Sequence, residues 1–305
     1  MTTRRPEGDA LRSQSAIDVR VRSPHVVPFE KLDGAGNDFV LLRAPAPIPD
    51  AEMIRRLLHR HHGIGGDGLL YLRTGDRLHA DDAELDAAAD YWNSDGGRAE
   101  YCGNGARCVA AVLLGDRADN DTVRFRLSDV LVRARRDGDA REGRYAVAHP
   151  IPRRHDCPSE IIGLASTLGL LEPPTLFDSG VPHLVLVTED PRSFDLERWA
   201  PIFRSHPSLG AAGANVDIVS AKPTEGRFFV RTFERGVEGE TLACGSGLLA
   251  VGTHLRARDG DRSVTLQSAS GAVFRVWEED SDAYLAGPAR RVFHGEVDLD
   301  ATGRA

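Results

Sequence analysis

An α+β architecture with two similar domains is predicted by three features of the sequence. These are short strand-like runs punctuated by glycine, few helical patterns, and an internal repeat. Short strands with scattered helices favour an α+β or mixed-barrel arrangement over a regular βαβ array. The 305 residues are enough to bury two cores of about 150 residues each.

The individual elements follow from local patterns along the chain. Residues 1–26 are rich in Arg, Ser and Asp with little periodic apolar content, so we expect a mobile extension there. A strand, a Gly-Ala-Gly-Asn-Asp turn and a second strand follow within 29–42. Apolar residues at 53, 54, 57 and 58 predict an amphipathic helix over 51–61, which glycines close before a strand at 69–72. Further strands are expected at 122–127, 184–188, 216–220, 228–233, 264–267 and 273–277.

The internal repeat is a cysteine-containing segment. Residues 99–105 (Ala-Glu-Tyr-Cys-Gly-Asn-Gly) recur as residues 240–247 (Glu-Thr-Leu-Ala-Cys-Gly-Ser-Gly), and an apolar, helix-like stretch follows each copy. Duplication of one domain is the natural interpretation. We therefore expect a first domain at 27–147, a second domain at 148–288, and a return of residues 289–305 to the first domain.

The stretches after the two cysteines, 106–114 and 248–255, are apolar on nearly every face. A helix that is apolar all round must be buried all round. A sheet wrapped around each helix would bury it, and so would a position between a sheet and the neighbouring domain.

Composition excludes several classes of function. Lys+Arg of 38 against Asp+Glu of 46 gives a net charge of −8, which disfavours non-specific binding to nucleic acid. The longest apolar run, 108–115, has about eight residues where a membrane span needs about 20. Four cysteines do not make a disulfide framework for so long a chain, so a reducing cytoplasm is the expected location.

Neither a metal nor a cofactor is expected. Lys31 and Lys222 are the only lysines, so a pyridoxal-phosphate enzyme would have to form its Schiff base with one of these two. The cysteine and histidine spacings do not match a zinc site. The glycine-rich loops near 34–36 and 63–66 are not part of a strand–Gly-x-Gly-x-x-Gly–helix unit, which a dinucleotide site requires.

The duplicated Cys-Gly-x-Gly turns are the strongest candidates for chemistry. Glycine lets the backbone approach a ligand closely, and a helix start carries free N–H donors and positive partial charge. Such a turn holds a carboxylate well and lowers the pKa of a thiol. One copy alone is equally consistent with a buried structural cysteine. Two copies facing each other across a cleft would let one thiol remove a proton while the other returns one from the opposite face.

Four other polar segments have ordinary structural explanations beside functional ones. Asn37 and Asn93 lie in sequences typical of turns, and His183 enters a strand as many core histidines do. The charged loop 234–240 is typical of a solvated surface, but it leads directly into Cys244. The position of this loop next to a candidate reactive cysteine favours a functional role for it.

Together these motifs resemble those of the diaminopimelate epimerase family, cofactor-independent isomerases of lysine and peptidoglycan biosynthesis. The resemblance implies two pseudo-symmetric domains, each a mixed β-barrel-like sheet wrapped around a central helix, with the active site in the cleft between them. It also implies an amino-acid substrate, interconversion of LL- and meso-diaminopimelate without a cofactor, and a homodimer. The matching segments, in the family's order, are 31–39, 62–68, 93–96, 100–108, 180–183 and 234–247.

The resemblance also implies a role for each matching residue. Cys102 and Cys244 become the acid–base pair, which His183 and Glu234 assist. The α-carboxylate would be held at the two helix starts, and the distal amino and carboxylate groups would be read by side chains from both domains. The residues that would hold the α-carboxylate are Gly103, Asn104, Gly245 and Ser246, with Asn37 at the reacting end of the site. The residues that would bind the distal groups are Asn93, Asn215 and Arg235.

Two departures from the family's pattern leave the substrate open. Gly68 stands where the family often has Gln, and Val181 stands where it has Asn. Each removes a side-chain amide that could contact substrate, so a two-cysteine racemase of another amino acid is an alternative. Two further alternatives are a cysteine hydrolase or acyltransferase that pairs Cys102 with His183, and an amino-acid-binding protein without catalysis.

Overall fold

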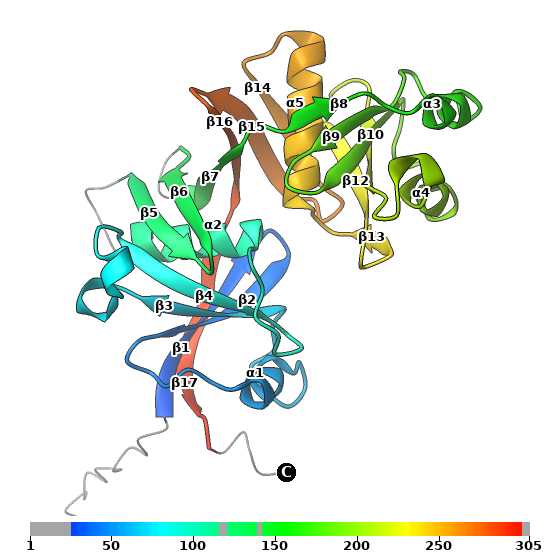
Figure 1. Cartoon of the computed structure of the whole chain (residues 1–305). Coiled ribbons are helices and arrows are strands. Elements are labelled where there is room, and N and C mark those ends of the chain that lie inside the picture. The colour runs from blue at the N-terminus through cyan, green and yellow to red at the C-terminus, as the bar shows by residue number, and fades with distance from the viewer. Residues whose placement is uncertain (1–25, 116–120, 139–141, 301–305) are drawn as a thin grey trace, which may run out of the picture.

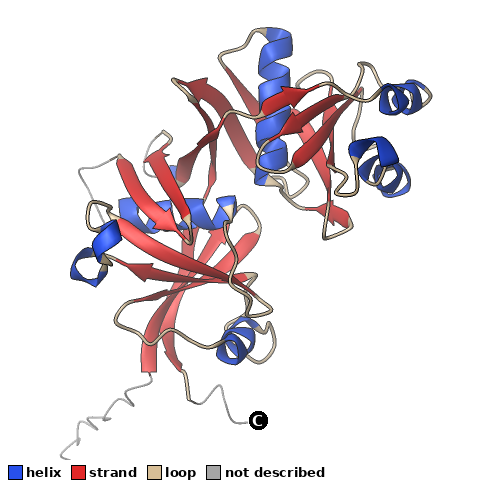
Figure 2. Ribbon diagram, viewed as in Figure 1, coloured by secondary structure: helices blue, strands red, loops and turns tan. Residues whose placement is uncertain are grey.

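The computed structural model describes residues 26–115, 121–138 and 142–300, and it shows two sheet-rich lobes (Figure 1). Residues 1–25 of the expected extension lie outside the described residues. Each lobe contains one long helix that lies against strands, and Figure 2 shows that strands dominate both lobes. Among the described residues, no helix has the length and apolar character needed to cross a membrane.

The first lobe is formed by the first half of the chain and the last strand. Its strands pair in the order β17–β1–β2–β3–β4–β5–β6–β7, and the pairs β2–β3 and β4–β5 are parallel. The strands are β1 (Val26–Gly34), β2 (Asn37–Arg43), β3 (Gly68–Arg73), β4 (Ala87–Asn93), β5 (Thr122–Leu127), β6 (Val130–Arg136), β7 (Arg144–Pro150) and β17 (Arg290–Asp298), and the helices are α1 (Ala51–Leu58) and α2 (Gly103–Gly115).

The second lobe repeats this pairing. Its strands follow the order β8–β9–β10–β11–β12–β14–β15–β16, the corresponding pairs β10–β11 and β12–β14 are parallel, and the short β13 lies beside β12. The strands are β8 (Arg153–His155), β9 (Thr175–Asp178), β10 (Pro182–Thr188), β11 (Asn215–Ser220), β12 (Phe228–Glu234), β13 (Gly239–Thr241), β14 (Ser263–Gln267), β15 (Val273–Glu279) and β16 (Asp282–Pro288), and the helices are α3 (Ser159–Ser166), α4 (Leu196–Arg204) and α5 (Gly245–Asp259).

The two lobes are therefore pseudo-symmetric, and the predicted fold class is confirmed. Helix α2 occupies the same position between β4 and β5 that α5 occupies between the β12–β13 pair and β14. Almost every residue of α2 is buried, and α5 is buried from Gly247 to Gly252 and at Leu255. Each helix packs inside the core of its own lobe, so the sheet wraps around it.

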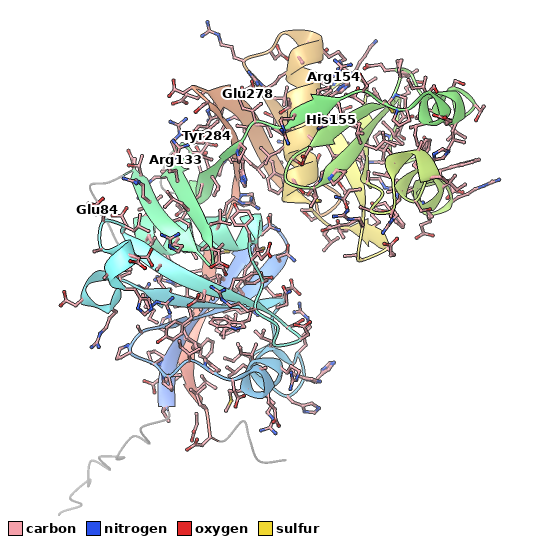
Figure 3. The ribbon with its side chains drawn as sticks, in the orientation of Figure 1. Glu84, Arg133, Arg154, His155, Glu278 and Tyr284 are labelled. Atoms are coloured by element: carbon pink, nitrogen blue, oxygen red, sulfur yellow. The ribbon has the colours of Figure 1, made fainter. Side chains whose placement is uncertain are left out.

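The lobes are joined edge to edge by antiparallel pairing of β7 with β16. The expected domain boundary after residue 147 falls inside β7, and the division of the chain into 27–147 and 148–288 stays a prediction. Ion pairs cross this joint from β6 and the residue after it to β15 and β16: Arg133 with Asp282, Arg135 with Glu279, and Asp137 with Arg275. Figure 3 labels Arg133 and Tyr284 at this joint.

The helix expected over 51–61 ends earlier, at Leu58. The amides of Ile64 and Gly65 fold back to donate to the Leu57 carbonyl at 2.8 and 3.0 Å, which turns the chain away from the helix axis. Gly63 permits this turn, because a Cβ atom there would lie 2.1 Å from the Arg56 carbonyl oxygen.

The close approach of α5 to its sheet yields a test of the fold. A Cβ atom on Gly252 would lie 2.6 Å from Cβ of Val276 in β15, so Gly252→Ala should lower the free energy of unfolding by about 1 to 3 kcal/mol. Gly163→Ala in α3 is the matched control, because a Cβ atom there meets nothing within 4 Å. The control should raise stability by about 0.5 to 1 kcal/mol through helix propensity. Equal effects of the two substitutions in urea unfolding would contradict this packing.

Candidate active site

The first lobe presents Cys102 immediately before helix α2. The amide of Gly105 donates to the Cys102 sulfur at 3.4 Å, and the amide of Ala106 donates to the Cys102 carbonyl at 2.8 Å. The cysteine is half-buried. Its thiol therefore lies at the N-terminal end of the central helix.

A chain of side-chain amides holds the neighbouring turn against this helix start. Asn104 donates to the Asn37 side-chain oxygen, and Asn37 in turn donates to Asp67 at 3.1 Å. The other side of Asn104 accepts from Arg107, a guanidinium that is fully buried. The structure thus brings Asn37 to the turn that contains Cys102 and Asn104, from which it is far apart in the sequence.

In the second lobe the candidate residues lie at one edge of three neighbouring strands. His183 on β10 pairs in register with Asn215 on β11, and the antiparallel β12 ends at Glu234 on the same edge. The Asn215 side-chain oxygen accepts from the Arg235 amide at 2.7 Å, and its NH₂ group lies 3.2 Å from His183 Nε2. Strand register therefore explains how residues from three distant segments meet.

A buried hydrogen-bond chain runs from this edge to the second cysteine. Asp217 lies 2.6 Å from His183 Nδ1, and both side chains are fully buried. His183 Nε2 lies 2.9 Å from the Ser246 hydroxyl, which lies 3.4 Å from the Cys244 sulfur. Thr232 donates to the other Asp217 oxygen at 2.7 Å. An ionised Asp217 is an acceptor only, so it fixes the proton of neutral His183 on Nδ1 and leaves Nε2 as an acceptor.

Glycine makes room for this chain at the start of α5. A Cβ atom on Gly247 would lie 2.2 Å from Asp217 Oδ1 and 3.2 Å from His183 Cε1. The second glycine of the Cys-Gly-Ser-Gly turn is therefore needed for the close approach of helix and strand as well as for the turn.

Burial changes the acidity of both thiols. Burial raises the pKa of Cys102, although the amides of Gly105 and Asn104 and the positive charge of Arg107 act to lower it. Burial also raises the pKa of Cys244, where the charges of Glu234 and Asp217 add to the effect and bring it to about 12. The lowered pKa that the helix-start position alone predicts is therefore wrong for the substrate-free protein, because desolvation outweighs the helix N–H groups.

The two lobes contact each other beside these residues. A Cβ atom on Gly36, next to Asn37, would lie 3.9 Å from Leu242 and 3.7 Å from Ser270 of the second lobe. Arg107 of the first lobe stacks on the ring of Phe274 of the second, with 5.2 Å between the guanidinium carbon and the ring centroid. The starts of α2 and α5 thus belong to one interlobe region.

Only some of the residues expected to bind the distal end of a ligand lie close together. Asn215 and Arg235 lie together in the second lobe, whereas Asn93 is exposed at the end of β4 and accepts from the Tyr91 hydroxyl at 2.8 Å. Val181 lies in the turn before β10, where the Ser179 amide donates to its carbonyl at 3.2 Å.

Four residues near the site were not singled out from the sequence: Asp67, Tyr91, Arg107 and Asp217. Asp217 and Tyr91 carried a usable signal, because each lies two positions from a singled-out asparagine, Asn215 or Asn93, and so shares its face of the strand. The others act through contacts between distant segments. Among the described residues there is no group of three or more His, Cys, Asp or Glu side chains that could hold a metal ion.

When the chain is compared with known protein families, both of its lobes match one family. Residues 29–145 and 175–292 match the family described as diaminopimelate epimerase. The chain belongs to the diaminopimelate epimerase family. The diaminopimelate epimerase of Gemmatimonas aurantiaca is 33% identical over 288 residues, which cover 88% of this chain and 98% of that protein. This member of the family is accordingly an isomerase.

Two further comparisons concern a racemase that is similar in sequence and a solved structure that is similar in fold. The O-ureido-serine racemase of Streptomyces lavendulae is 34% identical over 301 residues, which cover 91% of this chain and 97% of that protein. The crystal structure of the PhzF-family phenazine biosynthesis protein of Bacillus anthracis superposes with a TM-score of 0.66 at 15% identity, covering 89% of this chain and 99% of that one. At that identity the similarity shows a shared fold alone.

The Asp217–His183 contact makes a prediction about the histidine proton. In the native enzyme, ¹⁵N NMR of labelled histidine should show His183 with its proton on Nδ1, assigned by its loss in His183→Gln. Asp217→Asn offers an NH₂ donor to Nδ1, so it should populate the Nε2–H form. Asp261→Asn, at an exposed position between α5 and β14, is the control and should change nothing. An Nε2–H tautomer in the native enzyme would contradict this hydrogen-bond chain.

Proposed function

We propose that this isomerase interconverts LL- and meso-diaminopimelate by proton transfer at Cα between two cysteines, Cys102 and Cys244, without a cofactor. The observation that carries the proposal is the duplicated cysteine at the start of a buried central helix, once in each lobe, in a region where the lobes touch. A two-base exchange needs one proton-transfer group on each face of the reacting carbon.

The helix starts can stabilise the negative charge that a cofactor would otherwise take up in such a reaction. An amino acid's α-proton is weakly acidic, so the carboxylate must take up the developing negative charge. Backbone N–H groups of Gly103 and Asn104 in one lobe, and of Gly245 and Ser246 in the other, are the donors that a helix start leaves outside the helix. Asn37, held by Asp67 and Asn104, lines the reacting end.

The charge near Cys102 is positive and the charge near Cys244 is negative, and this difference supports opposite roles for the two thiols in proton transfer. The positive charge of Arg107 favours a thiolate at Cys102, and its Nε and Nη1 atoms have no hydrogen-bond partner among the described residues. The negative charges of Glu234 and Asp217 favour a neutral thiol at Cys244. We assign Cys102 as the thiol that ionises first and Cys244 as the thiol that stays protonated until the substrate carbanion forms.

His183 and Glu234 assist the second cysteine in this scheme. For the reverse reaction Cys244 must lose its proton, and Ser246 offers a route: its hydroxyl accepts the thiol proton while giving its own to His183 Nε2. The product is a Cys244 thiolate and an imidazolium paired with Asp217. Glu234 sets the charge beside Cys244 and prevents it from ionising too early.

Diaminopimelate is proposed as substrate because of the distal residues. Arg235 can grip a carboxylate through two parallel hydrogen bonds, and Asn93 and Asn215 add amides for a second amino-acid head group. Similarity to the O-ureido-serine racemase keeps a second candidate, a racemase of another polar amino acid, under consideration. Such a substrate has no distal carboxylate for Arg235 to bind.

The alternatives from other classes have less support. A hydrolase would need His183 beside Cys102, but the hydrogen-bond partners of His183 among the described residues, Asp217, Ser246 and Asn215, all belong to the second lobe. A binding protein needs no second thiol.

We also propose a homodimer in the cytoplasm. Strand β17 pairs with β1 on one edge, and its other edge has no strand partner in the part of the chain that the structure describes. Val292 and Phe293 on this strand are 51% and 46% exposed, as suits a contact between copies. The four cysteines are free thiols, as suits a reducing compartment.

Each thiol should be essential by itself. Cys102→Ala and Cys244→Ala should each lower epimerisation of LL-diaminopimelate by at least about 10³-fold, because neither remaining thiol can both remove and return the proton. The assay is chiral chromatography of the product. Cys157→Ala, which changes a half-buried thiol away from both helix starts, should keep full activity. Substantial turnover by either single variant would rule out the two-base assignment.

Arg235 tests the choice of substrate. Arg235→Lys should lower kcat/KM for diaminopimelate by about 10²-fold, because a single ammonium cannot reproduce the two parallel hydrogen bonds. Arg198→Lys on the surface of α4 is the control and should have no effect. The native enzyme should discriminate strongly against lysine and O-ureido-serine. If either is turned over as fast as diaminopimelate, the substrate assignment is wrong although the two-thiol chemistry stands.

A further inference from the structure

Tyr91 occupies the space beside the missing side chain of Gly68. A Cβ atom on Gly68 would lie 2.4 Å from Tyr91 Cε2 and 3.2 Å from Cζ, so the ring and any side chain at position 68 exclude each other. The ring also packs edge-on against Phe39, with 6.1 Å between centroids. Only 6% of Tyr91 is exposed. The absence of a side chain at position 68 is therefore matched by a tyrosine that fills the same space.

The hydroxyl of Tyr91 lies between two proposed site residues. It donates to the side-chain oxygen of Asn93 at 2.8 Å, and it lies near enough to the Cys102 thiol to act against the rise in the pKa of that thiol. Cys102 packs against the same core cluster that contains Tyr91 and Phe39. Tyr91 thus connects the proposed acid–base thiol to a residue proposed to read the substrate.

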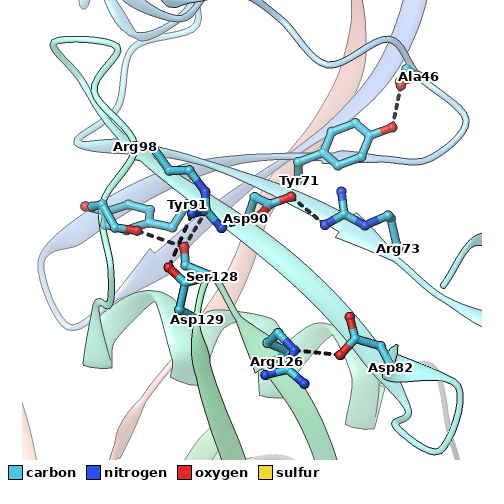
Figure 4. Close-up of polar contacts among 11 residues, drawn as sticks. Ala46, Tyr71, Arg73, Asp82, Asp90, Tyr91, Arg98, Arg126, Ser128 and Asp129 are labelled. Carbon is cyan, nitrogen blue, oxygen red and sulfur yellow. Dashed lines mark hydrogen bonds and ion pairs between the residues drawn. The ribbon is translucent and has the colours of Figure 1, made fainter. Parts of the chain in front are cut away.

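The strand beneath Tyr91 is firmly held, as Figure 4 shows. On the opposite face of β4, Asp90 pairs with Arg73 at 2.5 Å and with Arg98 at 3.1 Å. The Tyr91 amide donates to the Ser128 hydroxyl at 3.3 Å, and that hydroxyl donates to the Ala99 carbonyl at 2.8 Å. The ring is therefore set in place by a rigid strand and the close approach to Gly68.

A phenol has one proton, so Tyr91 cannot donate to Asn93 and to a Cys102 thiolate at the same time. When Cys102 is a thiol, its S–H donates to the phenol oxygen and the phenol donates to Asn93. When Cys102 gives its proton to water, the phenol keeps its own proton and turns it to the sulfur. The Asn93 carbonyl oxygen then has lost its donor and can accept from a substrate ammonium group.

We propose that Tyr91 is a further catalytic residue, whose hydroxyl stabilises the Cys102 thiolate and thereby releases Asn93 to bind the substrate's distal ammonium group. The proposal rests on the proposed function for the roles of Cys102 and Asn93. Ammonium binding at Asn93 and ionisation of Cys102 then favour each other, because both require the same orientation of one phenol proton. A substrate with a distal ammonium group thus promotes formation of its own base.

The test measures the thiolate directly and needs no substrate. Alkylation of each cysteine by iodoacetamide is followed against pH by peptide mass spectrometry. Tyr91→Phe keeps the ring in place, so it should raise the midpoint for Cys102 by about one pH unit and leave Cys244 unchanged. The other titratable groups that face Cys102 or Tyr91 stay constant in this comparison: Arg107, Tyr101, Cys108, Asp67 and Asp95.

Tyr71→Phe on the neighbouring strand is the matched control, since the hydroxyl of that buried tyrosine bonds the Ala46 carbonyl instead (Figure 4). It should leave both midpoints where they are in the native enzyme. An unchanged Cys102 midpoint in Tyr91→Phe would overturn the proposal, and so would an equal shift of both cysteines.

Kinetics then test the link to Asn93. Tyr91→Phe should lower kcat/KM for diaminopimelate by more than it lowers kcat/KM for an analogue without the distal amino group. Equal losses for the two compounds would overturn the coupling to the ammonium group. If neither compound is epimerised by the native enzyme while the Cys102 midpoint still shifts, the substrate assignment fails and the Tyr91–Cys102 contact is upheld.

Discussion

Burial of one helix inside each sheet is the constraint on which the rest of the molecule depends. A helix covered on all sides can meet a ligand only at an end, and the N-terminal ends of α2 and α5 carry the two cysteines. The same ends offer free N–H groups and positive partial charge. Duplication of the lobe duplicates both the thiol and the free N–H groups, which suits the proposed exchange of protons on two faces of one carbon.

Burial also creates the chemical difficulty that the neighbouring residues address. Desolvation raises the pKa of both thiols, and a thiol that never ionises cannot remove a proton. The surroundings then differ between the lobes, with Arg107 and Tyr91 beside Cys102 and with Glu234 and the Asp217–His183 pair near Cys244. Pseudo-symmetry of the backbone is thus combined with asymmetry of charge, and the two cysteines differ in how readily they ionise.

Much of the fold could be predicted because its signals are local. The segments 106–114 and 248–252 of the two central helices are almost entirely apolar, and β5 alternates polar and buried apolar residues as a half-buried strand does. Strand β4 escaped notice because its Ala-rich start has no alternation, and β17 because it is largely exposed along one edge. The cysteine turns were evident because the repeat displays them twice. The role of Tyr91 could not be predicted, since it depends on contact with Gly68, which is distant in sequence and adjacent only in the sheet.

Isotope labelling in D₂O tests two-base chemistry most directly. Native enzyme is incubated with LL-diaminopimelate in D₂O, and the α-deuterium content of substrate and product is measured by mass spectrometry during the first few per cent of conversion. Because one thiol removes hydrogen while the other delivers deuterium, the account predicts that meso product carries one α-deuterium while unreacted LL-substrate carries none. Rapid deuterium exchange into the LL-substrate would show that a single group both removes and returns the proton, and would contradict the roles assigned to Cys102 and Cys244.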